Sequence, residues 1–185
     1  MSTRTVVMPP DTGLKLYKWN ALLGLAEHQT TIKALRMDQH PVTKREDESD
    51  KSFLERLFKR IIEHINAKEW RHHDWYDNYS DNVVVVAPSA YLELLREPVA
   101  TSLEEYLTAN EEFTTENPEY NAEVLNITAN VDDDGLIARV WIQAIITGHP
   151  PTVARQTMTI VDLKKMDGKW WAYKQTGFRG PQETY

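Results

Sequence analysis

The fold is decided by residues 119–179, EYNAEVLNITANVDDDGLIARVWIQAIITGHPPTVARQTMTIVDLKKMDGKWWAYKQTGFR. This stretch contains two Asp-Gly turn signals, at residues 134–135 and 167–168, with β-favouring residues on both sides of each, as in hairpins. A third break contains Pro150 and Pro151, which cannot donate to a sheet ladder. We therefore expect four long antiparallel strands, and strands of this length form a sheet that twists and curls.

The segment upstream of these strands is predicted to contain helices that lie against the sheet. Apolar residues recur at helical spacing from Phe53 to Trp70, with charged residues on the opposite face. Residues 83–86 are all valine and indicate a short buried strand. Residues 102–105 (SLEE) match the capping-box spacing and begin a second helix. The predicted order is helix, short helix, short strand, helix and four long strands.

Composition narrows the class of protein. The apolar content of 41% and the charged content of 26% are those of a globular protein. The net charge of −7 argues against binding to nucleic acid, which requires clustered basic residues. No apolar run is long enough to cross a bilayer and the N-terminus lacks a secretory signal, so we expect a cytoplasmic protein that does not bind membranes. The absence of cysteine excludes disulfides and thiolate chemistry.

Two parts are expected along the chain. Residues 1–48 form an N-terminal extension, in which the apolar stripe of residues 14–37 predicts one helix that packs on the main domain or on a second subunit. Residues 38–50 are a polar connector. The main domain then occupies residues 49–185.

The stretch WRHHDWYDNYSDN, residues 70–82, gathers the histidine, aspartate and aromatic side chains from which a catalytic site could be built. Burial beside Trp75 and Tyr76 would raise the pKa of Asp74 and make it a general base. On a helix, His72 and His73 point roughly 100° apart, so only one of them can readily face a pocket. The alternative is that the aspartates are capping or exposed residues and the aromatic residues are core. Neither histidine has a partner at a ligand-like spacing, so we predict no metal site.

The strands carry a second group of candidates. His149 lies in the proline-containing turn, where functional side chains often collect. Polar or amphipathic side chains interrupt the apolar pattern of the strands at Trp141, Gln143, Arg155, Gln156, Trp171, Tyr173 and Gln175. On the concave face they would line a pocket for a flat ligand, and on the convex face they would form a dimer surface. The alternation along the strands does not indicate which of the two faces carries these side chains.

The order of elements resembles the nuclear transport factor 2-like fold and, within it, the SnoaL-like group. The similarity is carried by Lys68-Glu69-Trp70, by DNYSDNVVV at residues 77–85 and by DGKWWAY at residues 167–173. The resemblance implies an α+β fold in which N-terminal helices cover a cone-shaped, curled antiparallel sheet, a cystatin-like α+β barrel that encloses a pocket. Similar proteins include ketosteroid isomerase, scytalone dehydratase and polyketide cyclases, which move protons without a cofactor.

The resemblance implies a cofactor-free cyclase, isomerase or dehydratase that acts by acid–base catalysis on a hydrophobic polycyclic, polyketide-like or terpenoid-like molecule, in a homodimer. The predicted catalytic residues are His73, Asp74, His149 and Tyr173. The predicted substrate-binding residues are Tyr76, Tyr79, Trp141, Arg155, Trp171 and Gln175. The alternative is a non-catalytic small-molecule-binding or dimerisation module of the same fold, because a fold alone does not determine function.

Overall fold

The computed structural model describes residues 42–86 and 98–184 of the chain. Their elements follow the order α2 (Asp50–Ala67), α3 (His73–Asn78), β1 (Tyr79–Val86), β2 (Pro98–Ala100), α4 (Leu103–Glu116), β3 (Asn121–Val131), β4 (Ile137–Thr147), β5 (Val153–Met166) and β6 (Lys169–Thr184). The predicted order of helices and long strands is confirmed, and β2 is an additional strand. The helix predicted at residues 14–37 lies outside the described residues.

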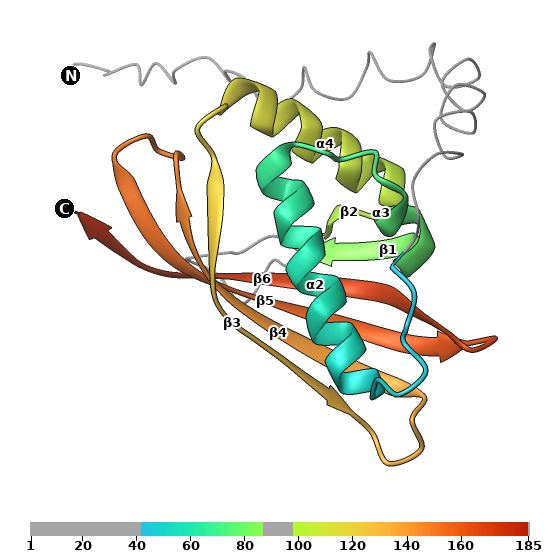
Figure 1. The fold of residues 1–185 in the computed structure, drawn as a ribbon. Helices are drawn as coiled ribbons and strands as arrows, with labels where there is room; N and C mark the ends of the chain where they lie inside the picture. Colours follow the sequence, from blue (N-terminus) through green and yellow to red (C-terminus); the bar gives the residue numbers. More distant parts are fainter. Residues whose placement is uncertain (1–41, 87–97, 185) are drawn as a thin grey trace, which may run out of the picture. The chain divides into compact units, whose positions relative to one another are not determined.

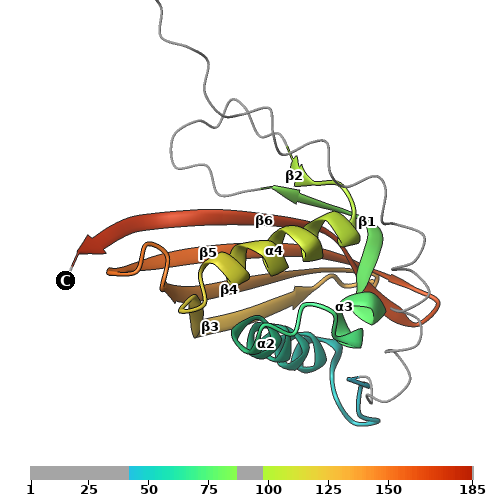
Figure 2. The ribbon, with the colours of Figure 1, turned by 90° about the horizontal axis from the view of Figure 1, so that it is seen from above.

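The strands form one mixed sheet in the order β2-β1-β6-β5-β4-β3 (Figure 1). All neighbours are antiparallel except β1 and β6, which run parallel from the pair Tyr79–Ala172 to the pair Val86–Thr176, with an irregularity between Tyr79 and Val84. The sheet curls around α2 and α4, which lie on its concave side (Figure 2). Within the described residues, β2 and β3 are the two edges, so the α+β fold is confirmed with a curled sheet that does not close.

Local signals place the ends of the helices. The Ser49 side chain accepts the N–H of Ser52 at 3.1 Å and caps α2. This helix ends before Trp70, because Lys68 adopts a left-handed conformation with φ of 62° and its N–H bonds back to the last turn. The Ser102 side chain caps α4 by accepting the N–H of Glu105 at 3.2 Å.

Glycine residues with a positive φ lie at the turns between the long strands. Gly135 and Gly168, at the two Asp-Gly turns, have φ of 68° and 78°, values that glycine adopts without steric cost. Gly148 also has a positive φ, of 80°, and a Cβ built there would lie 2.1 Å from the carbonyl oxygen of Glu119. This turn therefore packs its backbone directly against the chain that leads into β3.

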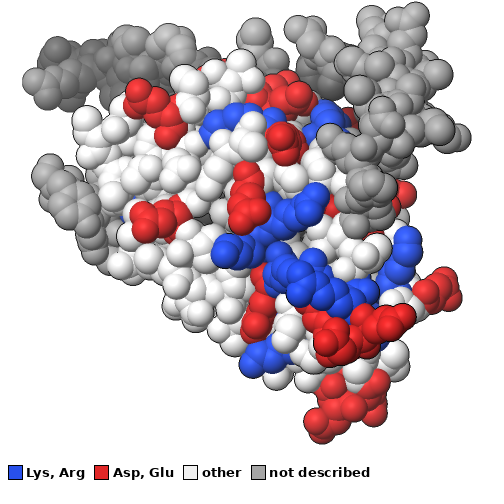
Figure 3. Space-filling model, in the orientation of Figure 1, with Lys and Arg blue, Asp and Glu red and all other residues white. Residues whose placement is uncertain are grey.

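The core lies between the concave face of the sheet and the three helices. Buried residues of α2, including Leu54, Leu57 and Phe58, pack with Val140 and Val161 of the sheet in one cluster. The opposite face of α2 carries acidic and basic side chains next to one another (Figure 3), and its Arg56 lies 2.7 Å from Glu48, which precedes the helix. Among the described residues, no helix is long and apolar enough to cross a membrane.

Candidate functional site

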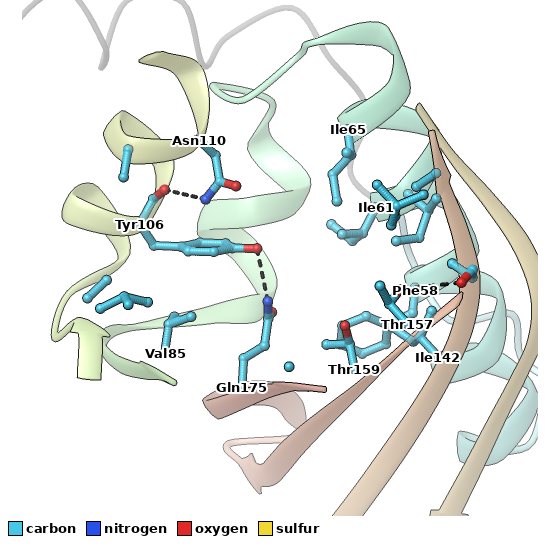
Figure 4. A pocket seen from close by; sticks show the side chains of 18 of the residues that line it. Phe58, Ile61, Ile65, Val85, Tyr106, Asn110, Ile142, Thr157, Thr159 and Gln175 are labelled. Carbon is cyan, nitrogen blue, oxygen red and sulfur yellow. Dashed lines mark hydrogen bonds between the residues drawn. The ribbon is translucent and has the colours of Figure 1, made fainter. Parts of the chain in front are cut away.

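A cavity of about 360 Å³ lies between the helices and the sheet (Figure 4). This volume is at the lower end of the range for ligand pockets, about 300–1,000 Å³. Its walls are mainly apolar, with Phe58, Ile61 and Ile65 from α2 facing Ile142 and Ala144 from β4. The polar residues among its described lining are Tyr79, Tyr106, Asn110, Tyr120, Thr157, Thr159 and Gln175.

Gln175 joins two tyrosines at one wall of this cavity. The Tyr79 hydroxyl donates to Gln175 Oε1 at 3.1 Å, and Gln175 Nε2 donates to the Tyr106 hydroxyl oxygen at 3.0 Å (Figure 4 shows the second bond). Burial raises the pKa of Tyr106 to about 12 and that of Tyr79 well above its ordinary value. Both hydroxyls are therefore protonated at neutral pH and act as hydrogen-bonding groups, not as bases.

The direction of these bonds leaves one proton without a protein acceptor. The Tyr106 oxygen already accepts from Gln175, and no described residue accepts the Tyr106 O–H. Asn110 donates its side-chain amide to the backbone carbonyl of Tyr106 at 2.7 Å, and its side-chain oxygen lies beside the cavity (Figure 4). The cavity thus offers the Tyr106 O–H as a donor and the Asn110 side-chain oxygen as an acceptor, in apolar surroundings that strengthen a hydrogen bond to a ligand.

Only two of the predicted site residues, Tyr79 and Gln175, are among the described lining of this cavity. The residues predicted on sequence grounds that are not among this lining are His73, Asp74, Tyr76, Trp141, His149, Arg155, Trp171 and Tyr173. His149 is exposed and its Nδ1 lies 2.8 Å from Asn117 Oδ1. Strand alternation buries Ile142 and Ala144 toward the helices and turns Trp141 to the outer face.

A β-bulge separates Gln175 from Tyr173, although the two residues have the same parity along the strand. Leu163 pairs with Ala172, but the adjacent Asp162 pairs with Lys174, so one extra residue is inserted into β6. Ala172 before the bulge and Gln175 after it consequently face the same, inner side. Sequence reasoning missed Tyr106 and Asn110, which are spaced four residues apart on α4 and which the pattern indicated only as helix positions.

A second group of polar side chains, the Asp74 cluster (Arg60, His64, His72, His73 and Asp74), is absent from the described cavity lining. Asp74 is 0% exposed. Five groups approach its carboxylate: Val42 N at 3.2 Å, Arg60 Nε at 2.9 Å, His64 Nε2 at 3.0 Å, His72 Nδ1 at 3.3 Å and His73 Nε2 at 3.1 Å. The cluster ties α2, α3 and the segment before α2 together.

The expectation that burial raises the pKa of Asp74 is wrong. Burial does act in that direction, but the hydrogen bonds from His64 and from the Val42 N–H outweigh it and lower the pKa below its ordinary value. Burial and the neighbouring His64 lower the pKa of His72 to about 4. Asp74 is therefore ionised at neutral pH and His72 is neutral, which makes Asp74 a weak base.

Comparisons with known proteins identify the fold. No protein-family model matches the sequence, and no curated protein matches it significantly. Among solved structures, an NTF2-like protein of unknown function from Pseudomonas putida is 14% identical with a TM-score of 0.54, over 69% of this chain and 84% of that one. A domain of unknown function with a cystatin-like fold from Nostoc punctiforme is 14% identical with a TM-score of 0.54, over 75% and 80%.

A candidate ketosteroid isomerase from Shewanella frigidimarina is also 14% identical, with a TM-score of 0.51 over 66% of this chain and 91% of that one. Identities this low reveal shared architecture and say nothing about shared chemistry. The described part of the chain has the NTF2-like, cystatin-like α+β fold.

Proposed function

We propose that this domain binds a compact, largely apolar small molecule that carries an oxygen acceptor such as a carbonyl group. The observation that carries the proposal is the cavity of about 360 Å³ into which Tyr106 brings an O–H that no described residue accepts. An unsatisfied donor in an apolar pocket favours a ligand that supplies the acceptor. Gln175 holds the Tyr106 oxygen in place, and Tyr79 holds Gln175.

The described lining of the cavity favours binding over acid–base catalysis. It includes no carboxylate, histidine or lysine side chain, and the pKa values of Tyr79, Tyr106 and Tyr120 are all raised by burial. A cyclase, isomerase or dehydratase requires a group that removes a proton near neutral pH. The described lining supplies donors but no such base.

A catalytic version of the proposal remains the second candidate, and the tyrosine pair supports it. The protonated Tyr106 hydroxyl, held in place by Gln175 and Tyr79, is suited to donate to an enolate oxygen, the role of an oxyanion hole. In this version the domain isomerises, cyclises or dehydrates a polyketide-like or terpenoid-like ketone.

Two matched ligands test the binding proposal. 2-Acetylnaphthalene carries a carbonyl acceptor, and 2-ethylnaphthalene has nearly the same shape without it; each is titrated against the full chain by displacement of N-phenyl-1-naphthylamine. Tyr106→Phe should weaken binding of the ketone about five- to tenfold, the value of one hydrogen bond, and leave binding of the hydrocarbon unchanged. Tyr173→Phe, on the outer face, is the control and should change neither affinity.

A filled cavity provides the second test. Ala144 is buried and lines the cavity, so Ala144→Phe places a ring in the space that the ligand would occupy. Both ligands should then lose binding while circular dichroism shows a folded protein. Unchanged binding by this variant would refute the proposed site. Accelerated exchange of the acetyl protons of 2-acetylnaphthalene with D₂O, lost in Tyr106→Phe, would favour the catalytic version.

The homodimer expected from sequence is proposed to form through the outer face of the sheet. Trp141 and Trp171 are partly exposed there and Tyr173 is 36% exposed. Aromatic residues are enriched at subunit contacts, because they bury a large area at low entropic cost. Sedimentation analysis of the full chain and of Trp171→Glu checks this proposal, because a dimer that uses this face should dissociate in the variant.

A further inference from the structure

The Asp74 cluster gathers metal-ligand types that lie far apart in the sequence. His64 belongs to the last turn of α2, His72 caps α3, and Asp74 is in the first turn of α3. The left-handed Lys68 ends α2 and turns the chain, so that α3 begins beside the end of α2. The rings of His64 and His72 stack with centroids 3.7 Å apart. This turn therefore gives His72 a partner, His64, that lies eight residues earlier in the chain and that no ligand-like spacing in the sequence indicated.

We propose that His64, His72 and Asp74 bind a divalent transition-metal ion, with Zn²⁺ the best match. One ligand atom from each of the three residues lies within 4.8 Å of the others. Asp74 Oδ2 is 3.0 Å from His64 Nε2 and 3.3 Å from His72 Nδ1. Tetrahedral ligands about 2.0–2.2 Å from Zn²⁺ are separated by roughly 3.3–3.6 Å, so both distances are close to those of an occupied site.

Each of the two histidines presents one ring nitrogen to Asp74. His72 Nδ1 accepts the backbone N–H of Asp74 at 3.2 Å, so this nitrogen carries a lone pair, and a bound ion would take that lone pair in place of the N–H. On the other side of the cluster, His64 Nδ1 lies 2.7 Å from Glu69 Oε2. A carboxylate behind a ligating histidine is the usual outer partner, because it fixes the ring and directs the other nitrogen toward the metal.

An independent observation points to a fourth ligand. His73 is 6% exposed, and neither of its ring nitrogens makes a hydrogen bond within the described residues. Its Nε2 nevertheless points toward the cluster, 3.1 Å from Asp74 Oδ1. A buried imidazole with no partner costs free energy, and a bound cation would remove that cost. His73 or a water molecule would complete the four ligands of the ion.

Arg60 takes the place of the ion when the site is empty of metal. Its Nε lies 2.9 Å from Asp74 Oδ2 and 3.4 Å from His64 Nε2, between the proposed ligands. The side chain is 43% exposed, so it can move into solvent without disturbing the core. The guanidinium and the metal ion thus compete for the same carboxylate, and this competition makes the proposal testable through a surface residue.

The test is a titration of the chelator-treated full chain with Co²⁺, followed by its visible absorption, and with Zn²⁺ in competition. We expect one equivalent to bind with the absorption of a four-coordinate site. His64→Gln and His72→Gln should each weaken binding by about 100-fold or more, since each removes a ligand. His149→Gln, in an exposed turn, is the matched control and should bind like the wild type.

Arg60→Gln distinguishes a metal site from a cluster that merely satisfies Asp74. Removal of the competing charge should tighten Co²⁺ and Zn²⁺ binding about tenfold or more. The residue is on the surface, so the variant tests the proposal even if the histidine variants fail to fold. Absence of binding by both the wild type and Arg60→Gln would overturn the proposal. Equal binding by His64→Gln, His72→Gln and the wild type would overturn it as well.

Discussion

Replacement of Asp74 by asparagine removes the charge around which α2 and α3 are joined, while the size of the side chain is kept. The carboxylate is 0% exposed and receives Arg60 Nε at 2.9 Å and His64 Nε2 at 3.0 Å. Loss of one partner of a buried ion pair costs about 3–5 kcal/mol, because the remaining partner stays desolvated. Arg60 can turn to solvent, so we expect the lower end of this range.

The assay is urea unfolding followed by circular dichroism, in the presence of a chelator so that no metal contributes. An expected loss of about 3 kcal/mol corresponds to a fall in Tm of about 6–12 °C for a chain of this size. Glu111→Gln is the control, since Glu111 is 51% exposed and its bond to Arg71 is a surface ion pair, worth about 0–1 kcal/mol. Equal losses in the two variants would show that Asp74 does not hold the cluster together.

Three further measurements test the fold. Gly148→Ala should lower the free energy of unfolding by more than about 2 kcal/mol, because its Cβ would lie 2.1 Å from a backbone carbonyl, whereas Gly135→Ala, with nothing within 4 Å, should cost only about 1 kcal/mol. Burial acts to raise the pKa of Asp50, but the hydrogen bonds from Lys165 and Lys44, together with the Trp170 side chain, outweigh it and lower the pKa from 3.8 to about 2. The ionised Asp50 carboxylate therefore stabilises the fold above its unfolded pKa, by about 1 kcal/mol after allowance for solvent. This contribution is lost as the pH falls from 3.8 to about 2. In acid unfolding, Asp50→Asn should lack this part of the pH dependence. Ser102→Ala should remove the α4 cap and cost about 1 kcal/mol in the same urea assay.

The elements could be predicted because their signals are local. The Asp-Gly pairs place glycine where a positive φ is required, at Gly135 and Gly168, and Ser102 satisfies the first free amides of α4. These preferences act within a few residues and survive in any tertiary context. The parallel pairing of β1 with β6 carries no such signal, since it joins residues about ninety positions apart and depends on where the helices leave room.

The grouping of residues into the cavity and the Asp74 cluster could not be predicted from the pattern of residues along the chain. Alternation would place Tyr173 and Gln175 on one face, but the bulge opposite Asp162 puts only Gln175 into the cavity. Likewise, the chain turn at Lys68 brings His64 to Asp74, although their spacing suggests no contact. By itself, then, the sequence determined which residues form strands, helices and turns, because those choices are made by neighbouring residues. The tertiary structure alone decided which side chains share a cavity or a carboxylate, because one inserted residue or one left-handed residue redirects everything that follows it.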